Sequence, residues 1–286
     1  MCSMFLCGLK NMNNRITDEF ANLKAENRGG FIPFIVAGDP NLSVTKELIL
    51  ELAKQGASVI ELGVPFSDPV ADGVTIQAAA ERALRNEISV KSILQIVAEV
   101  RNQGCETPII LFSYFNPILQ FGLEKFAETA KESGVDGCLI TDLVPEEAEE
   151  FRAILAKKDL ALIMLAAPTS SDERLQKICA KASGFVYAVS RAGVTGARNE
   201  TSSDAENLVN RLRKFTDLPI AVGFGISNAK QVAETWKYAD AAVVGSAIVA
   251  EIARLSLIMD ENSEEFIEKI GEFAGGLNRE TRKNVK

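Results

Sequence analysis

Short apolar runs alternate with amphipathic stretches along most of this sequence. The runs are rich in Val, Ile, Leu and Phe and are nearly continuous, which is typical of strands covered on both faces of a parallel sheet. Between them, apolar residues recur at helical spacing. Eight strands are predicted, at Phe31–Ala37, Ser58–Pro65, Pro108–Tyr114, Val135–Asp142, Leu160–Ala167, Gly184–Ser190, Pro219–Gly225 and Asp240–Ser246. Helices are predicted at Val44–Lys54, Val90–Val100, Glu146–Ala156, Ala205–Phe215 and Lys230–Tyr238.

The strand and helix pairs follow one another with no Pro-, Ser- or Gly-rich linker between them. This repetition predicts an α/β fold, a single closed (β/α)8 barrel of the TIM-barrel type, with residues 13–286 forming one catalytic domain. Residues 1–12 are expected to be a loose N-terminal extension. An open, doubly wound sheet is the alternative architecture.

Two of the connections are longer than the others. The one after the second strand holds an additional predicted helix over Thr75–Asn86, and the one after the sixth strand is the polar, glycine-containing segment Ser190–Asp204. In a barrel, such excess length lies in βα loops on the face that carries the active site. The second segment is therefore expected to act as a mobile lid.

The charge balance narrows the range of partners. The 286 residues include 31 Lys and Arg against 39 Asp and Glu, for a net charge of −8 and a pI near 4.9, which argues against nucleic-acid or anionic-membrane binding. The apolar run Ala241–Ala250 is about ten residues long, well short of the roughly 18 that span a bilayer. The five cysteines show no Cys-x-x-Cys spacing, so we expect reduced thiols in a cytoplasmic protein, with Cys105, Cys138 and Cys179 in the core.

The absence of histidine restricts the chemistry further. It excludes every His-containing catalytic triad and the ligand sets of most catalytic zinc sites. None of the predicted strands contains Lys, which disfavours a Schiff base on a barrel strand, and no tight acidic cluster indicates a metal site. Proton transfer must then rest on carboxylates, Tyr, Lys or Cys, and an acid/base reaction without cofactor or metal remains.

Two acidic residues are candidates for that transfer. Glu61 lies inside an apolar strand between Ile60 and Leu62, and a buried carboxylate is costly unless it is paired or its pKa rises. It is either a structural glutamate or a functional one, and it points either into the barrel or toward a helix. Asp72 follows in the loop, where an Asp before Gly is often only a turn former. As a pair, the two could divide acid and base roles around one small substrate.

Glycines end the last two predicted strands, in Gly223-Phe224-Gly225 and Val244-Gly245-Ser246. Helices are expected to start at Ser227 and Ser246. Bare glycines let a ligand approach backbone N–H groups, and a helix N-terminus adds positive potential, so these ends predict the phosphate site of a barrel.

Tyr187, on the sixth strand, leads into the lid residues Arg191, Thr195 and Gly196. A strand tyrosine is commonly a core residue, but this position also allows a contact with substrate. Together these residues predict an acid/base reaction on a small phosphorylated substrate.

The residues singled out so far resemble those of the alpha subunits of tryptophan synthase. The most specific match is ELGVPFSDPVADGVTIQAAAERAL at Glu61–Leu84, and further blocks follow the family's order between about Arg15 and Ala274. These blocks are PFIVAGDP from Pro33, TDLVPEE from Thr141, AAPTSSDERL from Ala166, VYAVSRAGVTGAR from Val186 and VGFGIS from Val222. The resemblance implies a (β/α)8 barrel that cleaves indole-3-glycerol phosphate to indole and glyceraldehyde 3-phosphate without a cofactor.

The resemblance also implies roles for individual residues. Glu61 would protonate indole C3, and Asp72 would hold the indole N–H and stabilise positive charge on the ring. Thr195 would hydrogen-bond Asp72 when the lid closes. The other residues implied are Tyr187 beside Glu61, and Gly196, Phe224, Gly225, Gly245 and Ser246 around the phosphate.

A β subunit is implied as partner in an α2β2 complex, with indole passed to it through a tunnel. Asp68 and the segment 114–117 fall in loops that the family presents to that partner. The apolar group Phe115, Ile118 and Phe121 is expected either at this interface or in a covered core. A free-standing lyase and a non-catalytic barrel that binds a sugar phosphate are the rival hypotheses.

Two positions depart from the family pattern. Val74 stands where a Pro is customary after ADG, and Val144 stands where a Pro is common before PEE. Both changes are expected to loosen loops without affecting the two acids.

Overall fold

Eight parallel strands close into one barrel in chain order, and the last strand pairs with the first. A computed structural model describes residues 14–189, 201–223, 225–259 and 262–279. The predicted barrel is confirmed, and the open sheet is wrong. The strands are β1 (Gly30–Val36), β2 (Ile60–Gly63), β3 (Ile109–Ser113), β4 (Gly137–Ile140), β5 (Ala161–Ala166), β6 (Val186–Val189), β7 (Ile220–Gly223) and β8 (Ala241–Val244).

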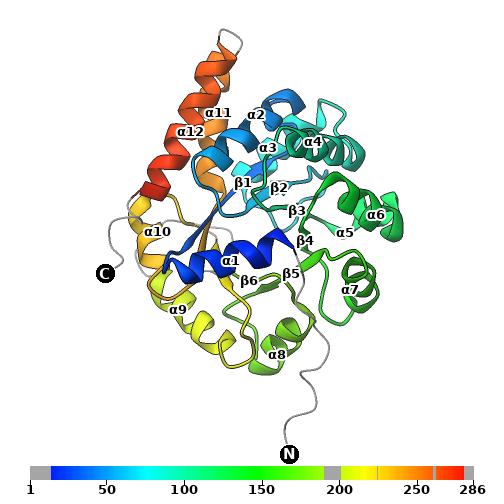
Figure 1. The fold of residues 1–286 in the computed structure, drawn as a ribbon, viewed down its shortest axis with the longest axis vertical. Coiled ribbons are helices and arrows are strands. Elements are labelled where there is room, and N and C mark those ends of the chain that lie inside the picture. Colours follow the sequence, from blue (N-terminus) through cyan, green and yellow to red (C-terminus); the bar gives the residue numbers. More distant parts are fainter. Residues whose placement is uncertain (1–13, 190–200, 224, 260–261, 280–286) are drawn as a thin grey trace, which may run out of the picture.

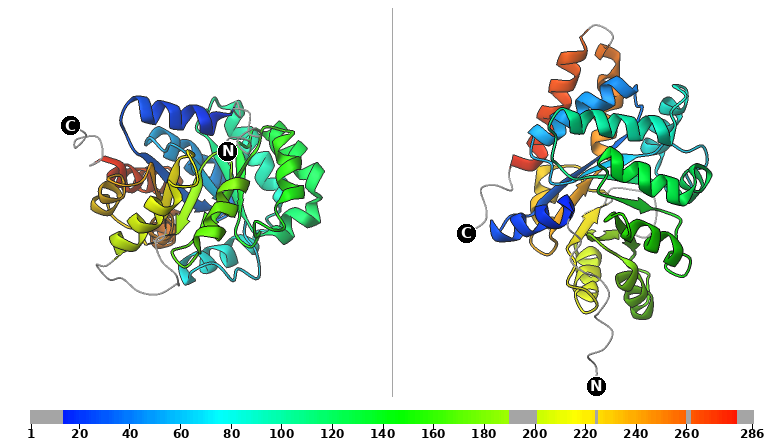
Figure 2. Two further views of the ribbon diagram at one scale, coloured as in Figure 1. Left: turned by 90° about the horizontal axis from the view of Figure 1, so that it is seen from below. Right: turned by 45° about the vertical axis from the view of Figure 1, so that its right-hand side comes forward.

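Helices surround the barrel, as Figure 1 shows. Six were predicted with small errors at their ends: α2 (Leu42–Lys54), α3 (Val74–Leu84), α4 (Val90–Asn102), α7 (Glu149–Ala156), α9 (Thr201–Leu212) and α10 (Ala229–Thr235). For α11 (Ser246–Met259) only the start was expected, and five more were not named from the sequence: α1 (Arg15–Ala25), α5 (Phe115–Phe121), α6 (Leu123–Ser133), α8 (Asp172–Lys181) and α12 (Ser263–Arg279). Helices α11 and α12 pack together and project from one side of the barrel (Figure 2).

Local sequence explains why these helices begin where they do. Asn14, Asn41 and Asn228 each accept a backbone N–H with their side chain at a helix start, which is a common N-cap. The expected helix start at Ser227 is therefore wrong, because Asn228 caps α10 and the helix begins at Ala229. The expected start at Ser246 is confirmed by α11.

Two apolar cores follow from the strand alternation. One lies between the barrel and its helices, and it contains Ile60 and Leu62 of β2. The other fills the inside of the barrel, and it contains Val59 together with residues such as Phe34 and Phe112. Because neighbouring side chains on a strand point to opposite faces, Glu61 points into the barrel.

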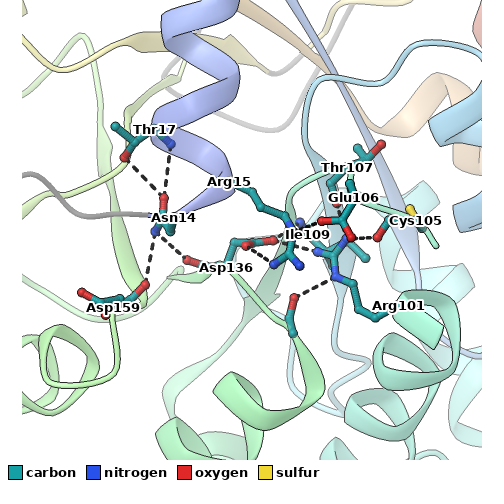
Figure 3. A network of polar contacts seen from close by, with 11 residues as sticks. Asn14, Arg15, Thr17, Arg101, Cys105, Glu106, Thr107, Ile109, Asp136 and Asp159 are labelled. Atoms are coloured by element: carbon teal, nitrogen blue, oxygen red, sulfur yellow. Dashed lines mark hydrogen bonds and ion pairs between the residues drawn. The ribbon is translucent and has the colours of Figure 1, made fainter. Parts of the chain in front are cut away.

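Helix α1 covers the amino-terminal end of the barrel, where Ile16, Phe20 and Leu23 join the inner core (Figure 1). A polar network fixes it there, as Figure 3 shows. The buried Asp136 carboxylate accepts from Arg15 at 3.2 Å, from Arg101 at 2.8 Å and from the backbone N–H of Ile109 at 2.8 Å. The Asp136 carboxylate thus joins α1, α4, β3 and β4 at this end of the barrel.

The apolar residues of α5 are part of the core. Ile118 is fully buried, and Phe115 and Phe121 are half-buried against the outer core. Phe115 makes an edge contact with Phe151. Of the two possibilities that the sequence allowed, the covered core therefore holds for Ile118.

Several expectations fall outside the described residues. These include the N-terminal extension 1–12 and positions 190–200 of the expected lid, whereas the last four residues of that segment begin α9. In the part of the chain that the structure describes, no helix has the length and apolar character needed to cross a membrane. The three cysteines Cys105, Cys138 and Cys179 are buried thiols, as predicted.

Candidate active site

Glu61 lies in the wall of the barrel and is 1% exposed. Its neighbours in register are Phe34 on β1 and Ile110 on β3, both of the inner core. Among the described residues, its Oε1 atom has no hydrogen-bond partner. Burial raises the pKa of this carboxyl to about 8, so the group is mostly protonated at neutral pH. A buried acid with an unused oxygen is suited to exchanging a proton with a ligand.

Tyr187 of β6 also points into the barrel and is 4% exposed. Burial, and then the nearby Glu61 carboxyl, raise the pKa of its hydroxyl well above the usual value. A Cβ atom added at Gly223 would overlap this hydroxyl. The glycine in β7 therefore leaves the space that the tyrosine head occupies beside Glu61.

Asp72 lies in the loop between β2 and α3, with its side chain partly covered. Burial raises the pKa of its carboxyl to about 6, and a hydrogen bond from the Tyr114 hydroxyl offsets part of that rise. Gln77 of α3 donates to the backbone carbonyl of Asp72 at 2.8 Å. The loop and the first turn of the helix therefore hold this acid together.

Tyr114 was expected on a partner-facing loop, but its side chain is buried, with 3% exposed. Its hydroxyl accepts the backbone N–H of Ala71 at 2.9 Å and hydrogen-bonds with Asp72. Its contact with Asp72 was not predicted, because FSYFNP reads as the end of an apolar strand. Only the pairing of β3 with β2 brings Tyr114 beside the Asp72 loop.

A pocket lies beside Asp72 and Tyr114. Asp72 lies in its wall, and Gly63, two residues further along β2 than Glu61, lines it from the barrel side. Glu61 therefore lies on the same face of β2, roughly 7 Å deeper along the strand. Four aromatic rings contribute to the lining, which suits a flat apolar ring: Phe34, Phe66, Phe112 and Tyr114.

Three of the expected phosphate residues, Gly225, Gly245 and Ser246, lie where the last two strands end. Gly225 follows β7 with φ +84° and open space at its Cβ position, and Gly245 immediately precedes α11. Ser246 is the first residue of that helix and is exposed. Thr195, Gly196 and Phe224 lie outside the described residues, so their places in the site stay predictions.

No group of three or more His, Cys, Asp or Glu side chains suited to a metal ion occurs within the described residues. The barrel places two carboxyl groups with raised pKa values at one end, near the glycine-bearing ends of β7 and β8. This arrangement is typical of enzymes of the (β/α)8-barrel class that use acid/base chemistry.

The family follows from the comparisons with known proteins. A family model described as tryptophan synthase alpha chain matches residues 20–282. The tryptophan synthase alpha chain of Caulobacter vibrioides is 47% identical over 261 residues, which is 91% of this chain and 95% of that protein. The alpha chain of Geotalea uraniireducens is 46% identical over 264 residues, or 92% and 96%. The chain therefore belongs to the tryptophan synthase alpha chain family.

Solved structures agree with this assignment. A crystal structure of tryptophan synthase subunit alpha from Legionella pneumophila has a TM-score of 0.85 and 35% identity, covering 95% of this chain and 99% of that one. A tryptophan synthase from M. tuberculosis in an open form has a TM-score of 0.83 and 32% identity, with coverage of 94% and 99%. The fold around Glu61 and Asp72 is thus the fold of this family.

Proposed function

We propose that this chain cleaves indole-3-glycerol phosphate to indole and glyceraldehyde 3-phosphate with Glu61 as the proton-transfer group and Asp72 as the carboxylate that stabilises the charged ring. The chain belongs to a family of tryptophan biosynthesis, and that membership supports the reaction. The observation that carries the assignment of residues is the buried Glu61 carboxyl, with its pKa raised to about 8 and one oxygen unpartnered within the described chain.

Glu61 acts first, as an acid. At neutral pH its raised pKa keeps it mostly protonated, so it can deliver a proton to C3 of the indole ring. Protonation converts the ring into an indolenine cation, which is an electron sink for the bond to the glycerol chain. A solvent-exposed glutamate would be ionised at the same pH and would have no proton to give.

Asp72 has the complementary role. The pKa of about 6 leaves this carboxyl mostly ionised at neutral pH, so it accepts the indole N–H and stabilises the positive charge that protonation creates. The pocket wall of Phe34, Phe66 and Phe112 holds the ring by apolar contact. Two carboxyl groups with different surroundings thus take different roles at one pH.

Bond cleavage completes the cycle. Glu61, now anionic, takes the proton of the hydroxyl on the carbon attached to indole C3. That carbon becomes the aldehyde carbon, and the electrons of the broken C–C bond return to the ring, which leaves as indole. One proton enters at C3 and one leaves the hydroxyl, so Glu61 ends in its starting state.

The phosphate group is assigned to the ends of β7 and β8. Gly225 and Gly245 have no side chain beyond the backbone, and Ser246 begins the 14-residue helix α11, whose N-terminus carries positive potential. Gly196 and Phe224 are proposed to complete this site, with Thr195 hydrogen-bonding Asp72. Tyr187 is proposed to contact the substrate beside Glu61.

As an alpha chain, the protein works with a β subunit of tryptophan synthase. We place the pair in the cytoplasm, and we assign the catalytic domain to residues 13–286. Asp68 is exposed in the loop that also carries Asp72, which supports its proposed place at the face toward the β subunit. Indole leaving the pocket would then enter that partner.

The test is release of indole from indole-3-glycerol phosphate by the purified chain, with and without a β subunit. Glu61→Gln is nearly isosteric but carries no transferable acid proton, so turnover is expected to fall at least about 10²-fold with substrate binding retained. Glu81→Gln, an exposed change on α3, is the matched control and is expected to keep wild-type turnover. Full turnover by Glu61→Gln would reject the assigned role.

A further inference from the structure

The loop of residues 65–73, which presents Asp72, has few attachments to the barrel. Val70 and Ala71 are exposed, and the internal bonds of the loop join Val70 to Asp68 and Asp72 to Pro69. Gln77 ties the loop to α3. In the described part of the chain, the only hydrogen bonds that join this loop to a neighbouring strand end are those of the Tyr114 hydroxyl, just after β3.

Tyr114 itself is fixed from several sides. It follows β3 directly, and its carbonyl accepts the Ser113 hydroxyl at 2.9 Å. The next residue, Phe115, donates its N–H to the Asp142 carboxylate at 2.7 Å. The centroid of the Tyr114 ring lies 5.1 Å from the centroid of the Phe66 ring. A buried side chain held in this way can serve as a fixed point for a neighbouring loop that has few attachments of its own.

The directions of the hydrogen bonds determine what the hydroxyl does. A phenol has one proton and two lone pairs. The Ala71 N–H fills one lone pair, and Thr141 also hydrogen-bonds with this oxygen. The proton is left for the Asp72 carboxylate, which as an anion can only accept. Burial keeps the pKa of Tyr114 at about 12, so the proton stays available at any working pH.

We propose that Tyr114 is a positioning residue of the active site: its hydroxyl anchors the Asp72 loop to β3 and donates its proton to the Asp72 carboxylate. The hydrogen bond aims the carboxylate and favours its ionised form. The importance of this for turnover rests on the proposed function of Asp72.

Few other charges can disturb this pair. Among the described residues that line the pocket, Asp72 and Tyr114 are the only titratable ones. Glu61 lies deeper in the barrel, and Asp68 points to solvent with its carboxylate accepting the Ser67 hydroxyl. A change in the titration of Asp72 after loss of the tyrosine hydroxyl can therefore be ascribed to the lost hydrogen bond.

The experiment is Tyr114→Phe in the full chain, with Tyr238→Phe as the matched control. Tyr238 is a half-buried tyrosine whose hydroxyl interacts with Thr235, and it has no place in the site. The titration of the Asp72 carboxyl is followed by 13C NMR and assigned with Asp72→Asn. Its pKa is expected to rise by roughly 0.5 to 1 unit in Tyr114→Phe and to stay at the wild-type value in the control.

Two further readouts complete the test. Hydrogen exchange at the Ala71 amide is expected to accelerate at least about tenfold in Tyr114→Phe, because its acceptor is gone. Turnover is expected to fall roughly tenfold, with no additional loss when the change is combined with Asp72→Asn. An unchanged Asp72 titration in a folded Tyr114→Phe chain would overturn the proposal. The NMR titration needs no turnover, so it stands even if the chain released no indole.

Discussion

The pKa values of two single residues make the pH dependence of this protein predictable. The reaction needs Glu61 protonated and Asp72 ionised. The ratio kcat/KM reports the free chain, in which the pKa of Asp72 is about 6 and that of Glu61 about 8. We therefore expect a bell-shaped profile of kcat/KM with its optimum near pH 7, falling about tenfold per pH unit outside the two pKa values.

The substrate phosphate also titrates near pH 6, so the acidic limb needs a control. Profiles of the wild type and Asp72→Asn at equal substrate concentrations separate the two contributions. The limb that vanishes in Asp72→Asn belongs to the protein, whereas a limb common to both belongs to the phosphate. A kcat/KM that stays flat up to pH 9 would contradict the protonated state assigned to Glu61.

The local sequence pattern explains why the functional role of Glu61 was predictable and that of Tyr114 was not. A glutamate between Ile60 and Leu62 breaks the apolar pattern of its strand, so its anomaly is visible in the sequence. Tyr114 follows an apolar run as an aromatic residue, which fits a core. Its role depends on which strand lies beside β2, and that information is held in the barrel closure and not in the local pattern.

At the scale of elements, helix α3 sets the position of the Asp72 loop. Its residues Ala79 and Ala83 pack on the inner core, and Ile76 and Ala80 line the pocket. At its far end, Arg82 makes a two-pronged ion pair with Asp39, which follows β1. The distances are 2.8 Å from Nε to Oδ1 and 2.7 Å from Nη2 to Oδ2.

This pair makes a prediction about α3. Asp39 is 2% exposed, and Arg82→Met would leave its carboxylate buried without a counter-charge, at a cost of about 3 kcal/mol. We expect amide exchange in α3 to accelerate by about 10², and kcat to fall because the Asp72 loop loses its support. Arg82→Lys is expected to rescue only partly, since an ammonium cannot bind both oxygens in this geometry.

The control for α3 is Arg85→Met, three residues away on the same end of the helix. Arg85 is exposed, so the amide exchange rates of α3 and the kcat of the Arg85→Met variant are expected to match those of the wild type. Mass-spectrometric hydrogen exchange on peptides covering Val74–Leu84 makes the comparison. Equal exchange in the two variants would show that α3 stays in place without the ion pair.

The elements themselves were predictable to different degrees. All eight strands were found because strands covered on both faces read as apolar runs. For helix α11 only the start at Ser246 was expected, and its extent was not, because its sequence is apolar on most sides and runs on from β8, so no period of 3.6 stands out. Helix α5 is only seven residues long, has Pro117 near its start, and has no side-chain cap. Such a segment lacks the signals on which a helix prediction depends.

At the scale of the whole molecule, the two ends of the barrel divide stability from chemistry. The amino-terminal end holds Asp136, 3% exposed, between Arg101 and Arg15 (Figure 3). Burial raises the pKa of Asp136 and lowers that of Arg101 even though the two are paired. Desolvation thus offsets much of the attraction, but loss of one partner would still leave a buried charge uncompensated.

The carboxyl-terminal end has the opposite balance. Glu61 has a folded pKa of about 8 against an ordinary value of 4.5, so the folded chain binds more protons than the unfolded chain between these limits. The contribution of the protonated Glu61 to the free energy of unfolding is therefore fully present below about pH 4.5, and it is lost as the pH rises through about 8. At pH 7 the group costs on the order of 3 kcal/mol, which is the strain of keeping a reactive acid in an apolar wall.

A pair of variants tests this division. Asp136→Asn is expected to lower the free energy of unfolding by about 3 kcal/mol while kcat stays within about twofold. Glu61→Gln is expected to raise it, on the order of 2 kcal/mol at pH 7, while losing turnover. Glu106→Gln, at the exposed edge of the Asp136 network, should leave the unfolding midpoint unchanged. Urea unfolding followed by the single tryptophan, Trp236, which donates to the Gly30 carbonyl at 3.0 Å, gives the readout. A loss of stability in Glu61→Gln comparable to that in Asp136→Asn would mean that the catalytic end also supports the fold. It would also mean that the buried Glu61 carboxyl does not lower the free energy of unfolding.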